Sequence, residues 1–161
     1  MNNIKKNFIY NLIYQFLILF IPLVISPYIS RVMGVEGVGI YSYTYSVVSY
    51  FMLFVLLGVN NYGNRIIAKI RDDKKELART FWGIYLFQLF MGLFMFFLYI
   101  GYIYLFDVEY KIIALIQSMF ILSALGDINW VFFGLEEIKI TILRNILIKV
   151  GTLIFIFLFV K

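Results

Sequence analysis

Long uncharged apolar stretches alternate with short charged segments along this chain. Residues 7–30, 37–64 and 80–106 carry no charge, whereas residues 65–79 hold six basic and three acidic side chains. A helix needs roughly 20 apolar residues to cross the hydrocarbon core of a bilayer, and each stretch is long enough. The pattern predicts an all-α, polytopic membrane helix bundle with about five spans, at residues 7–30, 38–62, 80–106, 112–133 and 140–161.

A glycine-rich interruption, Ser30 to Tyr43, separates the first two predicted spans and contains Gly34, Gly37 and Gly39. Glycine tolerates φ > 0, so this density predicts the hairpin between the two spans. The interruption also holds one cation, Arg31, and one anion, Glu36. Two interpretations of Arg31 stay open: an ion pair with Glu36 across the hairpin, or a side chain that faces a cavity and meets an anionic substrate.

The composition supports a membrane location and excludes several kinds of chemistry. The chain is 63% hydrophobic and 14% charged, an excess of apolar residues that indicates a lipid-facing surface. It has no cysteine and no histidine, which excludes disulfides, thiol catalysis and histidine metal ligands. No phosphate-binding loop and no hydrolase or metalloprotease motif is present. We therefore predict a protein that is not an enzyme and that has no cofactor and no metal.

The basic residues predict the orientation. With a cytoplasmic N-terminus, eleven lysines and arginines fall on the inside, and three, namely Arg31, Lys111 and Lys161, fall on the outside. The net charge of +5 therefore indicates cytoplasmic loops and no nucleic-acid partner. After Lys149, the apolar tract of residues 150–160 covers only about half of the bilayer core, so we expect either a truncated gene product or a fragment of a longer chain.

Polar residues near the ends of two spans are the candidates for a functional site. Polar side chains are costly in lipid unless they face protein or water. The second span ends with Asn60, Asn61 and Arg65, and the fourth ends with Asp127, Asn129 and Trp130. They either line a cavity or make structural contacts at the interface, with Arg144 and Lys149 as possible partners of Asp127. Ser42, Ser46 and Ser49 share one helical face, which suits either close packing or a polar cavity wall.

Three stretches in order resemble one family. They are SRVMGVEGVGIYSY after a proline-containing first span, GVNNYGNRIIAKIRDDK, and DINWVFFGLEEIK followed by ITILRNILIKVG. Together they are similar to the bacterial oligosaccharide flippases, the polysaccharide biosynthesis proteins of the superfamily that includes multidrug antiporters. The resemblance covers all 161 residues. It implies most of one lobe of a two-lobed transporter, although family members are much longer.

The resemblance also implies a function: translocation of undecaprenyl-pyrophosphate-linked oligosaccharide units across the bacterial cytoplasmic membrane, for capsule, O-antigen or other surface polysaccharide. The implied partners are the lipid-linked oligosaccharide and membrane lipid, with a polysaccharide polymerase and assembly proteins as further candidates. The candidate substrate-binding residues are Arg31, Arg65, Asn60, Asn61, Asp127, Asn129 and Trp130. The alternatives are a small-molecule exporter of the same superfamily, a membrane-embedded transferase subunit, and a membrane interaction protein without transport activity.

Overall fold

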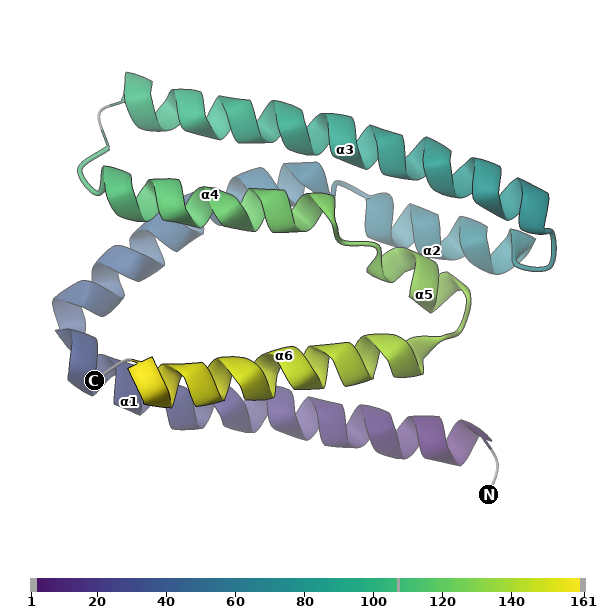
Figure 1. The fold of residues 1–161 in the computed structure, drawn as a ribbon, viewed down its shortest axis with the longest axis horizontal. Coiled ribbons are helices and arrows are strands. Elements are labelled where there is room, and N and C mark those ends of the chain that lie inside the picture. The colour runs from purple at the N-terminus through teal and green to yellow at the C-terminus, as the bar shows by residue number, and fades with distance from the viewer. Residues whose placement is uncertain (1–2, 107, 160–161) are drawn as a thin grey trace. The chain divides into compact units, whose positions relative to one another are not determined.

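The computed structural model describes residues 3–106 and 108–159, and every regular element in them is a helix. The helices are α1 (Asn3–Val55), α2 (Val59–Ile70), α3 (Lys74–Leu105), α4 (Lys111–Leu125), α5 (Asn129–Gly134) and α6 (Ile138–Phe159) (Figure 1). They form two compact units, one of residues 1–38 with 137–161 and one of residues 39–136. The predicted all-α membrane bundle is confirmed.

Four helical stretches in the described part of the chain are long and apolar enough to cross a membrane, so the predicted count of five is wrong by one. The difference arises at the glycine-rich interruption, which is not a loop. The backbone is helical on both sides of Gly34, and Gly34 alone departs from helical geometry, with φ 71° and ψ 173°. The predicted span 7–30 and residues 38–55 of the next one therefore belong to one kinked helix, because a single glycine at positive φ replaces the expected hairpin.

The predicted span boundaries differ from the helices at two further breaks. The second predicted span is interrupted at Gly58, whose φ of 72° ends one helix and precedes α2. The fourth is interrupted at residues 126–128, between α4 and α5. The charged segment 65–79, which lies between two predicted spans, is mostly helix, since α2 runs to Ile70 and α3 begins at Lys74. Asp73 caps α3 by accepting hydrogen bonds from the backbone N–H groups of Lys75 and Glu76.

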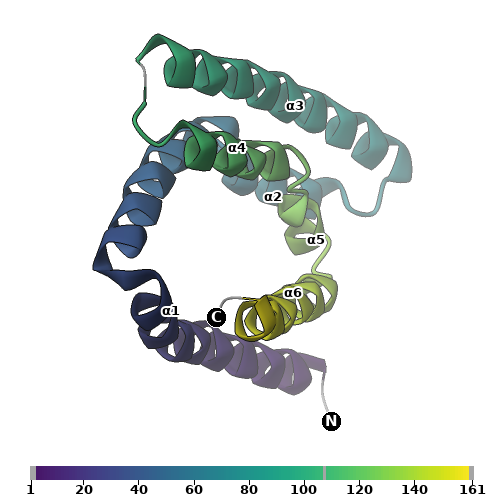
Figure 2. The same ribbon diagram turned by 60° about the vertical axis from the view of Figure 1, so that its left-hand side comes forward.

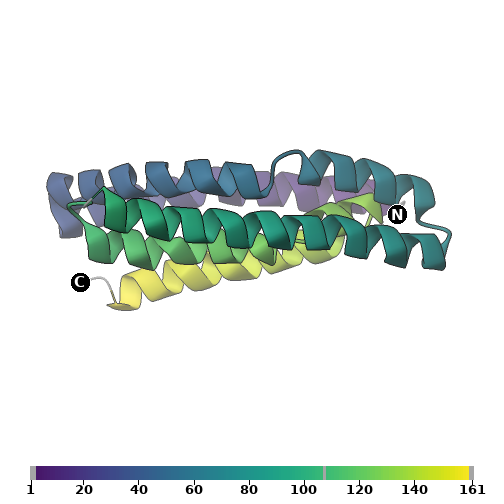
Figure 3. The same cartoon turned by 90° about the horizontal axis from the view of Figure 1, so that it is seen from above.

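In the unit of residues 39–136, α3 lies beside α4 at one end and beside α2 at the other (Figure 3). The first core cluster joins the C-terminal part of α1 to α3 and α4, through Val48, Val55, Tyr99, Ile103, Ala114, Ile121 and Ala124. Gly92 lets α4 approach α3, because a Cβ there would collide with the side chain of Leu125. Close approach at small residues is the usual packing mode of membrane helices.

The second core cluster joins α2, α5 and the start of α3 around Trp130, which is 1% exposed. Two glycines bring α2 and α5 together. A Cβ at Gly63 would lie 2.5 Å from Cε3 of Trp130, and one at Gly134 would lie 2.6 Å from Cβ of Ile67. Neither distance is allowed for a real side chain, so the α2–α5 packing depends on both glycines.

The other unit contains α6 and the N-terminal part of α1, which lie alongside each other (Figure 2). Their contact includes Tyr28 and Phe157, whose ring centroids are 4.7 Å apart. Most of the side chains that the structure describes in both segments are exposed, and many of these are apolar, as expected for surfaces that face lipid. The predicted last span of 140–161 corresponds to α6, and its residues 160–161 lie outside the described part.

Candidate functional site

The break at Gly58 opens a groove between the end of α1 and the start of α2, which we call the asparagine groove. Because Gly58 adopts φ 72°, the helix stops there and α2 starts on a new axis. The groove has a volume of about 840 Å³. It is lined by Tyr45, Ser49, Met52, Leu53, Leu56, Leu57, Gly58, Asn60 and Asn61. Its walls are mostly apolar, and the two amides supply most of its hydrogen-bonding capacity.

Three of the candidate residues lie on the exposed side of α2. Its other side, with Val59, Gly63 and Ile67, is buried in the second core cluster. Asn60, Asn61 and Arg65 are all exposed. Asn61 and Arg65 are four residues apart, so they share one helical face. An amide both donates and accepts hydrogen bonds, and a guanidinium binds phosphate with two parallel bonds, so this face suits a ligand with hydroxyl and phosphate groups.

Ser49 brings part of the predicted serine face into the same groove. Its hydroxyl donates to the carbonyl oxygen of Ser46 at 2.7 Å, and the Ser46 hydroxyl donates to that of Ser42 at 2.7 Å. Both hydroxyl protons are therefore used within α1, which leaves the Ser49 oxygen able to accept a hydrogen bond in the groove. Thr44, on another side of the helix, is the buried hydroxyl residue of this region.

Trp130 is not at a surface but at the centre of a buried hydrogen-bond network. Its Nε1–H donates to Oε1 of Gln88 at 3.2 Å, and Gln88 is fully buried. The Gln88 Nε2 group donates to the carbonyl oxygens of Ala124 at 2.7 Å and of Asp127 at 3.0 Å. These carbonyls flank the break after α4, where the regular hydrogen bonds of the helix end, and the Ala124 carbonyl also accepts from the backbone N–H of Asp127 at 3.3 Å. Gln88 and Trp130 therefore hold the α4–α5 junction.

Asp127 and Asn129 lie at this junction and are half-buried. The Asp127 carboxylate accepts a hydrogen bond from the backbone N–H of Asn129 at 3.1 Å, which stabilises the first turn of α5. The residues Arg144 and Lys149, considered above as partners of Asp127, lie in the other compact unit. In the described part of this unit, the ion pair is instead Arg71–Glu136, at 2.7 Å between exposed groups.

Arg31 lies in the unit that contains α6, on α1 one turn before the kink, and both Arg31 and Glu36 are exposed. Within the described residues these two side chains form no ion pair, so the pairing interpretation of Arg31 has no support in the structure. The kink explains this difference, because a hairpin loop would have brought both residues to one turn. The guanidinium of Arg31 remains available to an anion.

Gln88 is the residue that sequence reasoning missed. It is an uncharged polar residue inside an apolar span, and such residues in membrane helices regularly have a hydrogen-bonding role. That signal was present at Gln88 and also at Gln117, whose Nε2 donates to the carbonyl oxygen of Tyr41 at 3.4 Å. Neither position is close in the sequence to its partners, so the partners themselves could not be inferred.

These features define a multi-pass membrane protein with helices broken at glycines and a polar groove at one break. The chain belongs to the polysaccharide biosynthesis protein family, whose model matches residues 4–161. It is 27% identical over 162 residues to a protein of Escherichia coli (strain K12) named "Putative O-antigen transporter". That match covers 99% of this chain and 39% of the relative, so the chain spans about two fifths of the relative's length. No solved structure matches the chain.

Proposed function

We propose that this chain forms part of a transporter that moves oligosaccharide units, linked to undecaprenyl pyrophosphate, from the cytoplasmic to the outer leaflet of a bacterial plasma membrane. The family match over residues 4–161 carries this proposal. The relative named as an O-antigen transporter supports a surface polysaccharide as the product. In this proposal the protein is a transporter rather than an enzyme. Its partners are the lipid-linked oligosaccharide, membrane lipid, and a polysaccharide polymerase with its assembly proteins.

The physical task of such a transporter explains why polar groups interrupt apolar helices. A sugar head with a diphosphate cannot cross hydrocarbon, because each unsatisfied polar group there costs several kcal/mol. A water-filled path must hide the head while the lipid tail stays in the bilayer. In our proposal the asparagine groove is part of the wall of that path. Asn60 and Asn61 bind sugar hydroxyls, and Arg65 attracts the diphosphate.

The roles of the other candidates follow from their positions. Asp127 and Asn129 are half-buried at the α4–α5 junction. Because α5 packs against α2, which lines the asparagine groove, these two residues are proposed to shape the wall of the path next to that groove. Trp130 is proposed to support the wall from inside, because its ring is buried and stacked near Phe81, with ring centroids 5.8 Å apart. Arg31, with its exposed guanidinium, is proposed to meet the diphosphate outside the membrane core.

A chimeric transporter tests the function. This chain would replace the matching segment of the E. coli relative, in cells that lack their own O-antigen transporter. We expect the chimera to bring O-antigen to the cell surface. When Asn60 and Asn61 are both changed to Ala, the amount of surface O-antigen should fall at least five-fold. A matched control changes Asn64 to Ala, an exposed asparagine of α2 that does not line the groove. A chimera present in the membrane at normal level that displays no O-antigen would contradict the proposal.

Arg31 allows a sharper comparison in the same chimera. We expect Arg31→Ala to reduce surface O-antigen strongly and Arg31→Lys to reduce it in part, because lysine keeps the charge but loses the planar fork. Because Arg31 and Glu36 form no ion pair in the structure, exchanging their charges (Arg31→Glu with Glu36→Arg) should not restore transport. Recovery in that double variant, at equal protein levels, would assign Arg31 a purely structural role.

A further inference from the structure

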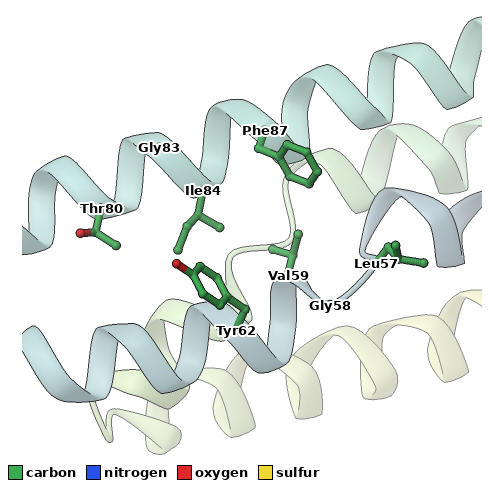
Figure 4. A pocket seen from close by; sticks show the side chains of 8 residues that line it. All are labelled: Leu57, Gly58, Val59, Tyr62, Thr80, Gly83, Ile84 and Phe87. Carbon is green, nitrogen blue, oxygen red and sulfur yellow. The ribbon is translucent and has the colours of Figure 1, made fainter.

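A second groove lies between α2 and the N-terminal half of α3 (Figure 4), and we call it the α2–α3 groove. It has a volume of about 520 Å³. Its lining is formed mainly by Leu57, Val59, Tyr62, Thr80, Ile84 and Phe87. Gly83 keeps it open, because a Cβ there would find no atom within 4 Å. The groove thus offers an apolar slot on the surface of a protein surrounded by lipid.

The polarity of this groove changes along its length. Figure 4 shows the hydroxyl groups of Thr80 and Tyr62 toward one end, with Phe87 and Leu57 toward the other. From Thr80 to Phe87 the helix rises about 10 Å. A slot with hydroxyls at one end and only hydrocarbon at the other matches an amphiphile with a polar head and an extended chain.

Charged residues stand next to the polar end. Thr80 also borders a neighbouring hollow lined by Asp73, Lys75, Glu76 and Arg79. The surrounding segment, residues 65–79, has a net charge of +3. The hollow itself holds two acidic and two basic side chains, so the positive charge belongs to the segment as a whole. This excess of basic side chains favours an anion near the polar end of the groove, with Lys75 and Arg79 as the basic groups that line the hollow.

We propose that the α2–α3 groove binds one anionic phospholipid of the bilayer. The lipid phosphate lies at Lys75 and Arg79, where basic side chains attract anionic headgroups. One acyl chain lies along Val59, Ile84 and Phe87. A zwitterionic phospholipid gains the same contacts for its chain but less from the positive segment. This site is distinct from the asparagine groove, and it does not depend on the transported substrate.

Lipid titration tests the proposal directly. The purified chain in detergent is titrated with dioleoyl phosphatidylglycerol or dioleoyl phosphatidylcholine, and bound lipid is counted by native mass spectrometry. We expect one phosphatidylglycerol to bind at least five-fold more tightly than phosphatidylcholine. Arg79→Gln should weaken phosphatidylglycerol binding about five-fold, the effect of one basic residue near an anionic headgroup, whereas Arg79→Lys should keep most of it.

A groove-filling variant separates this site from general attraction to a basic surface. Gly83→Leu places a side chain at the slot, where its Cβ meets no atom within 4 Å, and should abolish the preference for phosphatidylglycerol. Gly101→Leu is the matched control on the same helix, since its Cβ also meets no atom within 4 Å and it does not line the groove. Equal binding of the two lipids to the native chain would overturn the proposal. The proposal would also be overturned if Gly83→Leu kept the preference for phosphatidylglycerol while its midpoint of thermal unfolding equalled that of the native chain.

Discussion

Gln88 is the side chain whose removal should affect this protein most. It serves three groups at once, the Nε1–H of Trp130 and the carbonyl oxygens of Ala124 and Asp127. Gln88→Leu fits the apolar surroundings but removes the partner of the Trp130 N–H and of the Asp127 carbonyl, whereas the Ala124 carbonyl keeps the backbone N–H of Asp127. Each unsatisfied buried group costs about 1–3 kcal/mol. We expect a clearly lower midpoint of thermal unfolding in detergent.

A double-mutant cycle checks the cause. Trp130→Phe removes the N–H that Gln88→Leu would leave unpaired, so the double variant should lose less stability than the sum of the single variants. Simple additivity would show that the hydrogen bond between these residues contributes little. The sequence could not lead to this pair, because Gln88 and Trp130 are 42 residues apart and no sequence pattern places one beside the other.

At the scale of elements, the packing of α2 against α5 should depend on Gly63 and Gly134. A Cβ at Gly63 would lie 2.5 Å from Trp130, and one at Gly134 would lie 2.9 Å from the backbone oxygen of Asn64. Alanine at either position must push the helices apart, which typically costs about 1–3 kcal/mol. Gly101→Ala is the control, since it has open space and should stabilise α3 slightly. Thermal unfolding of the three variants in detergent measures the difference. Equal unfolding temperatures would contradict the close packing.

The sequence predicts the helices well and their breaks poorly, for a physical reason. Hydropathy depends on the average over roughly 20 residues, and that average identifies α3 and α6 closely. A break depends on the backbone of one residue, as at Gly58, which lies in an uncharged stretch and leaves the average unchanged. At Gly34 the error is the reverse: three glycines predict a loop, but only one of them leaves helical geometry. The amides of Asn60 and Asn61 were identified as candidates, whereas the groove that contains them depends on the break at Gly58.

At the scale of the whole molecule, the alternation of spans and the excess of basic residues lead to a testable topology. The chain has no cysteine, so single cysteines report one position each. Suitable sites are Asp72, Glu109 and Glu137, which are exposed and lie between helices. Asp72 is better than Asp73, because Asp73 caps α3 and its loss would weaken that helix. A membrane-impermeant maleimide then labels only the cysteines that face outward in intact cells.

We expect Glu109→Cys to react in intact cells, and Asp72→Cys and Glu137→Cys to react only after the membrane is permeabilised. The reason is that six basic residues of the segment 65–79 lie around Asp72 and three more, Lys139, Arg144 and Lys149, follow Glu137, and basic loops stay in the cytoplasm. The experiment distinguishes two ways in which the predicted topology could be wrong. Labelling of all three sites on the same side would show that α3 and the α4–α5 pair do not cross the membrane. The reverse alternation, with only Asp72→Cys and Glu137→Cys labelled from outside, would confirm the crossings and show that the basic loops beside these two residues face outward.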